Sequence, residues 1–351
     1  MKILIINPFG IGDALFTVPV VRAIKEKYPD SFVGYWCNER VGELVESIPG
    51  INKIFPLSRG DVKRVYRGLK RGVALVCLIS QIRKERFDVA FDFSLDSRYG
   101  LWSKLAGIKK RVGFDYKGRG RFLADKINLK GYFGKHVIEY NLDLLRLINI
   151  EPKDKSLKIA VSGEDKNKAR STLKEYGVAA TDLLIGVAPG GGASWGKDAI
   201  YKQWPAEKFA EVVDRLIKDS NVKVVLLGSA DEKPIADIVR KNNNRIIDLT
   251  GKLSLRELAA VISELKVLVC NDGGPLHMAV ALGVKTVSLF GPVDEKVYGP
   301  YPPSAEHIVV KKDVSCRPCY KDFRFTGCSN DRRCLDDIDV DEVFEKVKNL
   351  S

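Results

Sequence analysis

The stretch Asn271-Asp272-Gly273-Gly274-Pro275-Leu276-His277 stands between a short apolar run at 265–270 and a segment with helical composition at 276–282. A second apolar run, rich in β-branched residues, follows at 284–289. This order of strand, glycine turn, helix and strand is typical of a parallel α/β sheet, in which ligands bind beyond the carboxyl ends of the strands. Free backbone N–H groups and the positive end of the helix favour an anion there. The stretch therefore predicts a binding site for a phosphate-like group.

Each polar or small residue of this stretch can serve such a site. Asp272 can fix the turn, while Gly273 and Gly274 allow a ligand to approach the backbone. Pro275 starts the helix without wasting a hydrogen-bond donor, and His277 lies in the first helical turn, within reach of a phosphate. In the alternative interpretation, Asp272 is only a helix N-cap and His277 only a packed side chain.

The same alternation of apolar strands and amphipathic helices runs through both halves of the chain, and it predicts two doubly wound parallel sheets. The pattern relaxes near residues 151–154, where we expect a linker. We therefore predict an N-terminal domain at 1–160, a C-terminal domain at 161–335 and a cleft between them. The remaining residues, 336–351, predict a closing helix that packs back on the first domain. Strands are expected at 2–6, 32–36, 53–55, 88–93, 111–114, 183–188, 222–227, 245–248, 265–270 and 284–289.

Composition restricts the class of protein. Of the 351 residues, 45% are hydrophobic and 29% are charged, as in a soluble globular protein. No apolar run approaches the ~20 residues that span a bilayer, and the apolar start of the chain is too short for a signal peptide. We therefore expect a cytoplasmic protein.

The positive charge is concentrated in the first half. Residues 1–150 carry 27 Lys and Arg against 15 Asp and Glu, whereas residues 151–351 carry 31 against 30. A basic face suits nucleic acid, an anionic membrane surface or an acidic acceptor molecule. The segment Arg59–Arg86 holds nine basic and two acidic residues around an apolar run, which predicts a membrane-surface helix or a solvated helix face. We expect no nucleic-acid partner, because no recognised motif appears and the aromatic residues are not interleaved as stacking platforms.

Three further features are candidates for chemistry. Asp13 ends a glycine loop at the start of a helix, where its carboxylate can take a proton from an attacking hydroxyl or act as an N-cap. Gly190 and Gly191 follow a strand directly and resemble a turn that embraces a phosphate. Lys202 lies just before a helix, and its ammonium can neutralise a diphosphate leaving group or be a solvated surface charge.

Four of the seven cysteines fall within 19 residues, in the spacing C-x2-C-x8-C-x5-C. Four thiolates can close a tetrahedral site for zinc or iron. Unbound thiols are the alternative, and disulfides are less expected in a cytoplasmic protein. These cysteines are Cys316, Cys319, Cys328 and Cys334.

Taken together, the motifs Gly10–Asp13, Lys202–Pro205 and Asp272–His277 resemble glycosyltransferase family 9, the ADP-heptose:lipopolysaccharide heptosyltransferases, over essentially the whole chain. The resemblance implies a GT-B fold, in which two Rossmann-like domains bind the acceptor and the nucleotide-sugar donor respectively. It implies an inverting transfer of a heptose from ADP-heptose to an inner-core sugar of lipopolysaccharide, without a catalytic metal. The basic first half fits an anionic glycolipid acceptor, so we expect a peripheral protein at the inner face of the inner membrane.

The resemblance also implies residue roles. Asp13 would be the general base, Lys202 the partner of the donor phosphates, and Asp272, Gly273, Gly274 and His277 the cradle of the diphosphate. The chain departs from the family at Gly273, where a Thr or Ser often stands, and in its glycine-rich turn after residue 189.

The cysteines resemble the Cys-rich tails of some members, and also the iron-binding motif of related protein O-heptosyltransferases. A protein acceptor or another nucleotide sugar therefore stays open. From another class, a basic, metal-clasped nucleic-acid-binding module without catalysis is the remaining alternative.

Overall fold

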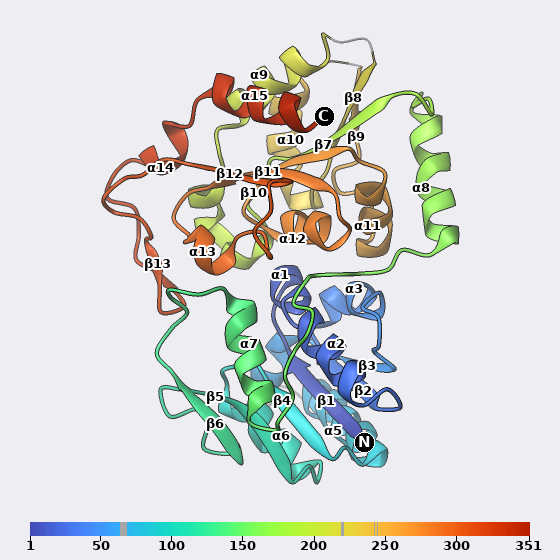
Figure 1. The fold of residues 1–351 in the computed structure, drawn as a ribbon, viewed down its shortest axis with the longest axis vertical. Coiled ribbons are helices and arrows are strands. Elements are labelled where there is room, and N and C mark those ends of the chain that lie inside the picture. The colour runs from blue at the N-terminus through green and yellow to red at the C-terminus, as the bar shows by residue number, and fades with distance from the viewer. Residues whose placement is uncertain (64–68, 219–220, 242, 244) are drawn as a thin grey trace. The chain divides into compact units, whose positions relative to one another are not determined.

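The computed structural model describes residues 1–63, 69–218, 221–241, 243 and 245–351. The chain divides into two compact units, unit 1 (Met1–Leu157) and unit 2 (Lys158–Ser351). Each unit contains one six-stranded parallel sheet with helices on both faces (Figure 1). The predicted α/β class, with two doubly wound sheets, is confirmed, and the division falls close to the expected boundary at residue 160.

Unit 1 has the strand order β3-β2-β1-β4-β5-β6. Because helices cover both faces, β1 is buried almost throughout and consists of consecutive apolar residues rather than an alternating pattern. The strands are β1 (Lys2–Asn7), β2 (Phe32–Cys37), β3 (Lys53–Pro56), β4 (Val89–Asp92), β5 (Lys110–Tyr116) and β6 (Asp125–Leu129). The helices are α1 (Ile11–Leu15), α2 (Val18–Lys27), η1 (Glu39–Val41), α3 (Gly42–Glu46), α4 (Arg59–Lys63), α5 (Leu69–Glu85), α6 (Ser97–Leu105) and α7 (Val137–Arg146).

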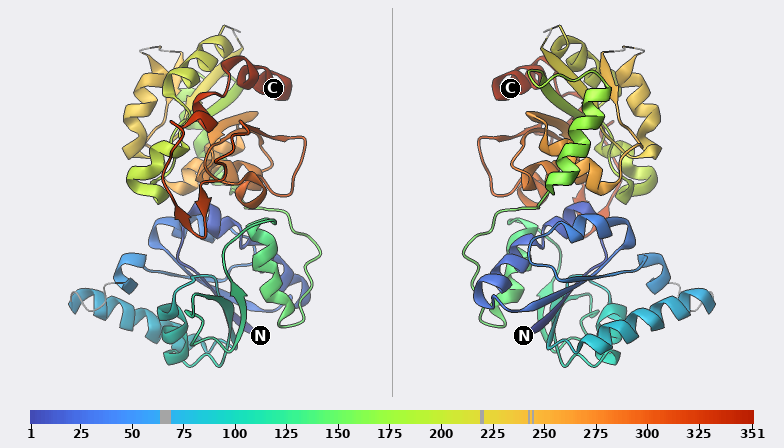
Figure 2. Two further views of the ribbon diagram at one scale, coloured as in Figure 1. Left: turned by 90° about the vertical axis from the view of Figure 1, so that its left-hand side faces the viewer. Right: turned by 90° about the vertical axis from the view of Figure 1, so that its right-hand side faces the viewer.

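The two faces of the unit 1 sheet are covered by different helices. Leu4 and Ile6 pack with side chains of α5 and α6, whereas α2 and α7 contact each other on the opposite face (Figure 2). The expected basic helix at 59–86 corresponds to α4 and α5, and its residues 64–68 lie outside the described residues.

Unit 2 repeats this topology in the order β12-β11-β10-β7-β8-β9. Its strands are β7 (Leu183–Ala188), β8 (Val222–Leu226), β9 (Ile246–Asp248), β10 (Val267–Asn271), β11 (Lys285–Phe290) and β12 (His307–Lys311), and a short antiparallel pair, β13 (Tyr320–Lys321) and β14 (Arg324–Phe325), follows. The helices are α8 (Gly163–Glu175), η3 (Ala193–Lys202), α9 (Ala206–Leu216), η4 (Ala230–Glu232), α10 (Lys233–Arg240), α11 (Leu255–Ser263), α12 (Gly274–Ala281), α13 (Glu295–Tyr298), α14 (Arg333–Asp336) and α15 (Val340–Leu350).

The closing helix α15 belongs to unit 2 and lies against α9 (Figure 1). Its apolar residues Val343, Val347 and Leu350 join the core that also contains Phe209. Helix α15 thus covers an apolar surface formed by α9 and β11 in unit 2. The expected packing of this helix on the first domain stays a prediction.

In both sheets, the strands are added in sequence first on one side of the starting strand and then on its other side, so the strand order reverses between two neighbouring strands. These are β1 and β4 in unit 1 and β7 and β10 in unit 2, and each pair is parallel and in register. Ligands of open α/β sheets bind outside the carboxyl ends of the strands at such a point. Asp13 lies shortly after the end of β1, and the stretch Asn271–His277 begins at the end of β10. Both therefore lie at such a point of their sheets.

Candidate active site

The side chain of Asn271 holds the loops of unit 2 together at the end of β10. It is buried, and its Oδ1 accepts a hydrogen bond from the backbone N–H of Trp204 at 3.0 Å. Its Nδ2 donates to the carbonyl oxygens of Pro189 at 2.7 Å and Gly190 at 3.2 Å. One amide therefore fixes the turn after β7, the turn after β10 and the segment before α9 relative to one another.

Lys202 and Asp272 form a buried ion pair beside this tie. Their Nζ and Oδ2 atoms lie 2.7 Å apart, and the two side chains are only 8% and 7% exposed. The Lys202 ammonium also lies 5.2 Å from the ring centroid of Trp195, which gives it a cation–π contact. The interpretation of Lys202 as a solvated surface charge is therefore wrong.

Asp272 does not cap the helix that follows it. Gly273 occupies the N-cap position of α12 without a side-chain cap, and Pro275 lies in the first turn. Since the Asp272 carboxylate is bound to Lys202 instead, the capping alternative is excluded. Gly273 has an extended backbone, and a Cβ added to it would meet its nearest atom, Pro275 Cδ, only at 3.8 Å. The space beside this helix N-terminus is therefore open enough for a side chain.

His277 is buried in the first part of α12, with its Nε2 4.0 Å from Asp272 Oδ1. Burial lowers the pKa of His277 to about 4, although the Asp272 charge acts in the opposite direction and Lys202 adds to the lowering. The imidazole is therefore neutral near pH 7 and can act toward a ligand as a hydrogen-bonding group rather than as a cation.

The carboxylate of Glu232 binds the glycine-rich turn after β7, and this residue was not predicted from the sequence. Glu232 Oε1 accepts the N–H of Gly192 at 3.0 Å, and its Oε2 accepts the N–H of Ser229 at 2.8 Å. A Cβ on Gly190 would lie 1.8 Å from Glu232 Oε1, and one on Gly191 would lie 2.5 Å from the carbonyl oxygen of Ala199. The capping-box spacing Ser229-x-x-Glu232 was the available signal for this glutamate.

In unit 1, Asp13 is the third residue of α1, and Gly10 is the N-cap, so Asp13 is not the cap residue. Its backbone carbonyl accepts a hydrogen bond from Asn7 Nδ2 at 2.8 Å, which ties α1 to the end of β1. The side chain of Asp13 is half-buried.

A second aspartate, Asp92, ends the neighbouring strand β4 and was missed from sequence, because it appeared only as part of an expected strand. It is buried, and its Oδ1 accepts the N–H of Ser94 at 2.8 Å. Burial raises the pKa of Asp92 from its ordinary value of 3.8 to about 6.

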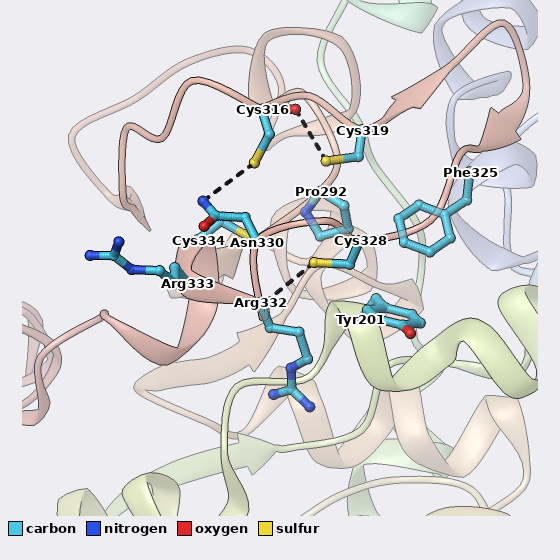
Figure 3. Close-up of a pocket in the computed structure, with 10 residues that line it drawn as sticks. All are labelled: Tyr201, Pro292, Cys316, Cys319, Phe325, Cys328, Asn330, Arg332, Arg333 and Cys334. Atoms are coloured by element: carbon cyan, nitrogen blue, oxygen red, sulfur yellow. Dashed lines mark hydrogen bonds between the residues drawn. The ribbon is translucent and has the colours of Figure 1, made fainter.

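The four clustered cysteines line one pocket of unit 2 (Figure 3). All seven cysteines of the chain are free thiols, so the disulfide alternative is not realised. Among the described residues, no three His, Cys, Asp or Glu side chains are already arranged around a metal position. Cys319 Sγ donates to the carbonyl of Cys316 at 3.1 Å, and burial raises the pKa of Cys334 to about 11. The pocket is lined by Cys316, Cys319, Cys328, Cys334, Tyr201, Pro292, Phe325, Asn330, Arg332 and Arg333.

Comparisons with known proteins give relatives from one family. The sequence profile of glycosyltransferase family 9 (heptosyltransferase) matches residues 76–328. Lipooligosaccharide heptosyltransferase 2 of Campylobacter jejuni is 25% identical over 355 residues, which covers 100% of this chain and 99% of that protein. Lipopolysaccharide heptosyltransferase 2 of Escherichia coli is 27% identical over 309 residues, which covers 83% of each chain.

Solved structures show the same fold. The E. coli ADP-heptose lipopolysaccharide heptosyltransferase II superposes with a TM-score of 0.77 at 22% identity and covers 100% of this chain and 98% of its own. A glycosyltransferase family 9 structure from Veillonella parvula superposes with a TM-score of 0.80 at 21% identity, with 99% and 96% of the two chains covered.

The pKa of Asp92 makes the stability of the protein depend on pH. Between pH 4 and pH 6 the folded chain retains a proton that the unfolded chain has released, so the free energy of unfolding falls as pH rises through this window. Asp92→Asn removes this titration and keeps an oxygen that accepts the Ser94 N–H. We expect the free energy of unfolding of the variant, relative to the unchanged protein, to rise by about 2 kcal/mol from pH 4 to pH 7.

Equilibrium denaturation with urea across this pH range measures the effect. Asp30→Asn, at an exposed position of unit 1, is the control. If the Asp92→Asn and unchanged proteins have parallel pH profiles, Asp92 does not titrate as described.

Proposed function

Because this chain belongs to glycosyltransferase family 9, we propose that it transfers a heptose from ADP-heptose to an inner-core sugar of lipopolysaccharide. The observation that carries this proposal is the buried Lys202–Asp272 pair, with His277 beside it, at the N-terminus of α12. Relatives that bear heptosyltransferase names over the full length of the chain support it.

The donor diphosphate is proposed to bind at the N-terminus of α12. The first N–H groups of a helix have no partner within it and favour an anion. The backbone beside Gly273 is open, Lys202 supplies a fixed positive charge, and neutral His277 supplies a hydrogen-bonding group. Since these groups compensate the charge that develops on departing ADP, the proposed transfer uses no catalytic metal.

The acceptor is proposed to be activated by Asp13 in unit 1. Its carboxylate takes the proton of the acceptor hydroxyl, and the hydroxyl oxygen forms a bond to the anomeric carbon. The bond from that carbon to the ADP oxygen breaks with the electron pair leaving on ADP, so one displacement inverts the configuration. The four cysteines take no part in these steps, and any metal ion that they hold would be structural.

The role of Asp13 predicts a separation of catalysis from donor binding. With ADP-heptose and heptose-deficient lipopolysaccharide as substrates, Asp13→Ala should lower kcat by about a hundredfold or more, because the general base is removed. The Kd for ADP should stay within about twofold, because Asp13 belongs to unit 1 whereas the proposed donor groups belong to unit 2. The release of ADP measures the transfer, and Asp30→Ala is the control. Retained turnover would remove Asp13 from this role.

The role of Lys202 predicts weaker donor binding when its charge is lost. Lys202→Met alone leaves the Asp272 carboxylate buried without a partner, which is itself destabilising. The double variant Lys202→Met/Asp272→Asn keeps the site neutral, and we expect its ADP affinity to fall roughly tenfold to a hundredfold, as for a lost hydrogen bond to a charged group.

Calorimetric titration with ADP, UDP and GDP checks this prediction. The unchanged protein should prefer ADP, and Lys197→Met, an exposed lysine of η3, should bind ADP normally. A preference for UDP or GDP would point to another nucleotide sugar, and an unaltered ADP affinity in the double variant would contradict the role of Lys202.

We further propose that the protein works at the cytoplasmic face of the inner membrane and that α5 contacts the lipid surface. Among the helices of the described residues, none is long and apolar enough to span a bilayer. Val73 and Val76 on α5 are nevertheless 53% and 59% exposed, and Cys77, which follows Val76, is also exposed.

An anionic bilayer is the partner that the charge of this unit favours, since the first 150 residues carry the excess of Lys and Arg. On vesicles of phosphatidylethanolamine and phosphatidylglycerol, Val73→Ser/Val76→Ser should bind about tenfold more weakly, because two valines no longer bury apolar surface. Co-sedimentation measures this, with Ile238→Ser, an exposed apolar residue of unit 2, as the control. Equal binding of both variants would exclude α5 as the contact.

A further inference from the structure

The segment that carries the four cysteines has little regular structure of its own. Between the end of β12 and the start of α14, the described chain contains only the two-residue strands β13 and β14. Four of its residues that are not glycine have left-handed backbone conformations, Asp322, Phe323, Asp331 and Arg332. Such conformations cost free energy and persist only where the surroundings fix them.

The cysteine side chains of this segment line a pocket, and polar groups form hydrogen bonds to their sulfur atoms. The Arg332 N–H donates to Cys328 Sγ at 3.3 Å, and Asn330 Nδ2 lies 3.8 Å from Cys316 Sγ (Figure 3). These two contacts place polar hydrogen atoms against two of the four sulfur atoms. Arg317 follows Cys316 directly, donates to the carbonyl oxygens of Gly291 and Val293, and pairs with Glu295 at 3.1 Å, which holds this part of the segment in place.

The same segment supports the residues that hold Lys202. Trp195, whose ring faces the Lys202 ammonium, packs against Tyr320 at 5.1 Å and Phe325 at 5.0 Å between ring centroids. The Arg332 guanidinium donates to the carbonyl of Gln203 at 2.8 Å, directly after Lys202. A change in the cysteine pocket therefore reaches the ion pair through one layer of aromatic side chains and one hydrogen bond.

We propose that Cys316, Cys319, Cys328 and Cys334 bind one thiophilic metal ion, zinc or iron, and that this ion positions Lys202 by fixing the segment that packs on Trp195. The donor set fits such an ion, because four sulfur ligands in one pocket are the ligands of structural zinc and of iron–sulfur sites. The sulfur atoms are not already gathered around one point, so binding draws them together and releases the protons of the thiols to solvent. The positioning of Lys202 rests on the proposed donor site, whereas the metal site does not.

Metal content tests the first part without any substrate. Full-length protein purified under reducing conditions should contain about one zinc or iron per chain by elemental analysis. Cys328→Ser/Cys334→Ser should lose it, and Cys77→Ser, which changes the exposed cysteine of α5, should retain it. Metal near zero in the unchanged protein, together with no uptake of added Zn²⁺ or Fe²⁺, overturns the site. Equal metal in the double variant overturns it as well.

Reconstitution tests the second part on a chain without mutations. After removal of the metal with a chelator, the Kd for ADP should rise about tenfold and recover when Zn²⁺ or Fe²⁺ is added back. The recovery should be absent in Cys328→Ser/Cys334→Ser. An ADP affinity that is equal with and without bound metal contradicts the positioning role. Bound metal in a protein that does not bind ADP at all would instead refute the proposed donor site and leave the metal site standing.

Discussion

The buried pair of Lys202 and Asp272 is the constraint on which the rest of unit 2 depends. Two charges that are almost fully removed from water are tolerated only when each compensates the other. The two residues come from segments far apart in sequence, and they meet because β7 and β10 are neighbours in the sheet. Asn271 then fixes the turns on both sides, and Trp195 covers the ammonium. The sheet topology, the hydrogen-bonded amide and the aromatic layer therefore all act to keep this ion pair in place.

Much of the fold was predictable because parallel strands covered on both faces are continuous apolar runs. The expected strand at 183–188 has the predicted bounds. Of the four edge strands, β3 and β9 were expected, whereas β6 and β12 were not. Strand β6 is mostly polar and only Leu129 is buried in it, so it lacks the apolar signal. The packing of α15 on α9 was not predictable, because periodicity shows which side of a helix is apolar but not which surface covers it.

The site was predictable to a similar degree and for a related reason. Residues that belong to a local turn, such as Asp272 and His277, are visible in sequence because glycine and proline mark the turn around them. Glu232 and Asp92 are not, since their importance arises from a long-range contact and from burial. The structure also changed the interpretation of Asp272, because its carboxylate binds a distant lysine instead of the adjacent helix.

The two turns at the carboxyl edge of unit 2 differ in charge: the Glu232 carboxylate lies at the turn after β7, whereas the Asp272 carboxylate after β10 is paired with Lys202. The turn after β7 already has its Gly192 N–H bound to the Glu232 carboxylate, so a phosphate placed there would meet a negative charge and lose a donor. The turn after β10 begins a helix and has Lys202 beside it, which favours an anion. This difference supports the proposed diphosphate site at α12, and the close approach of Glu232 and of the Ala199 carbonyl accounts for glycine at positions 190 and 191.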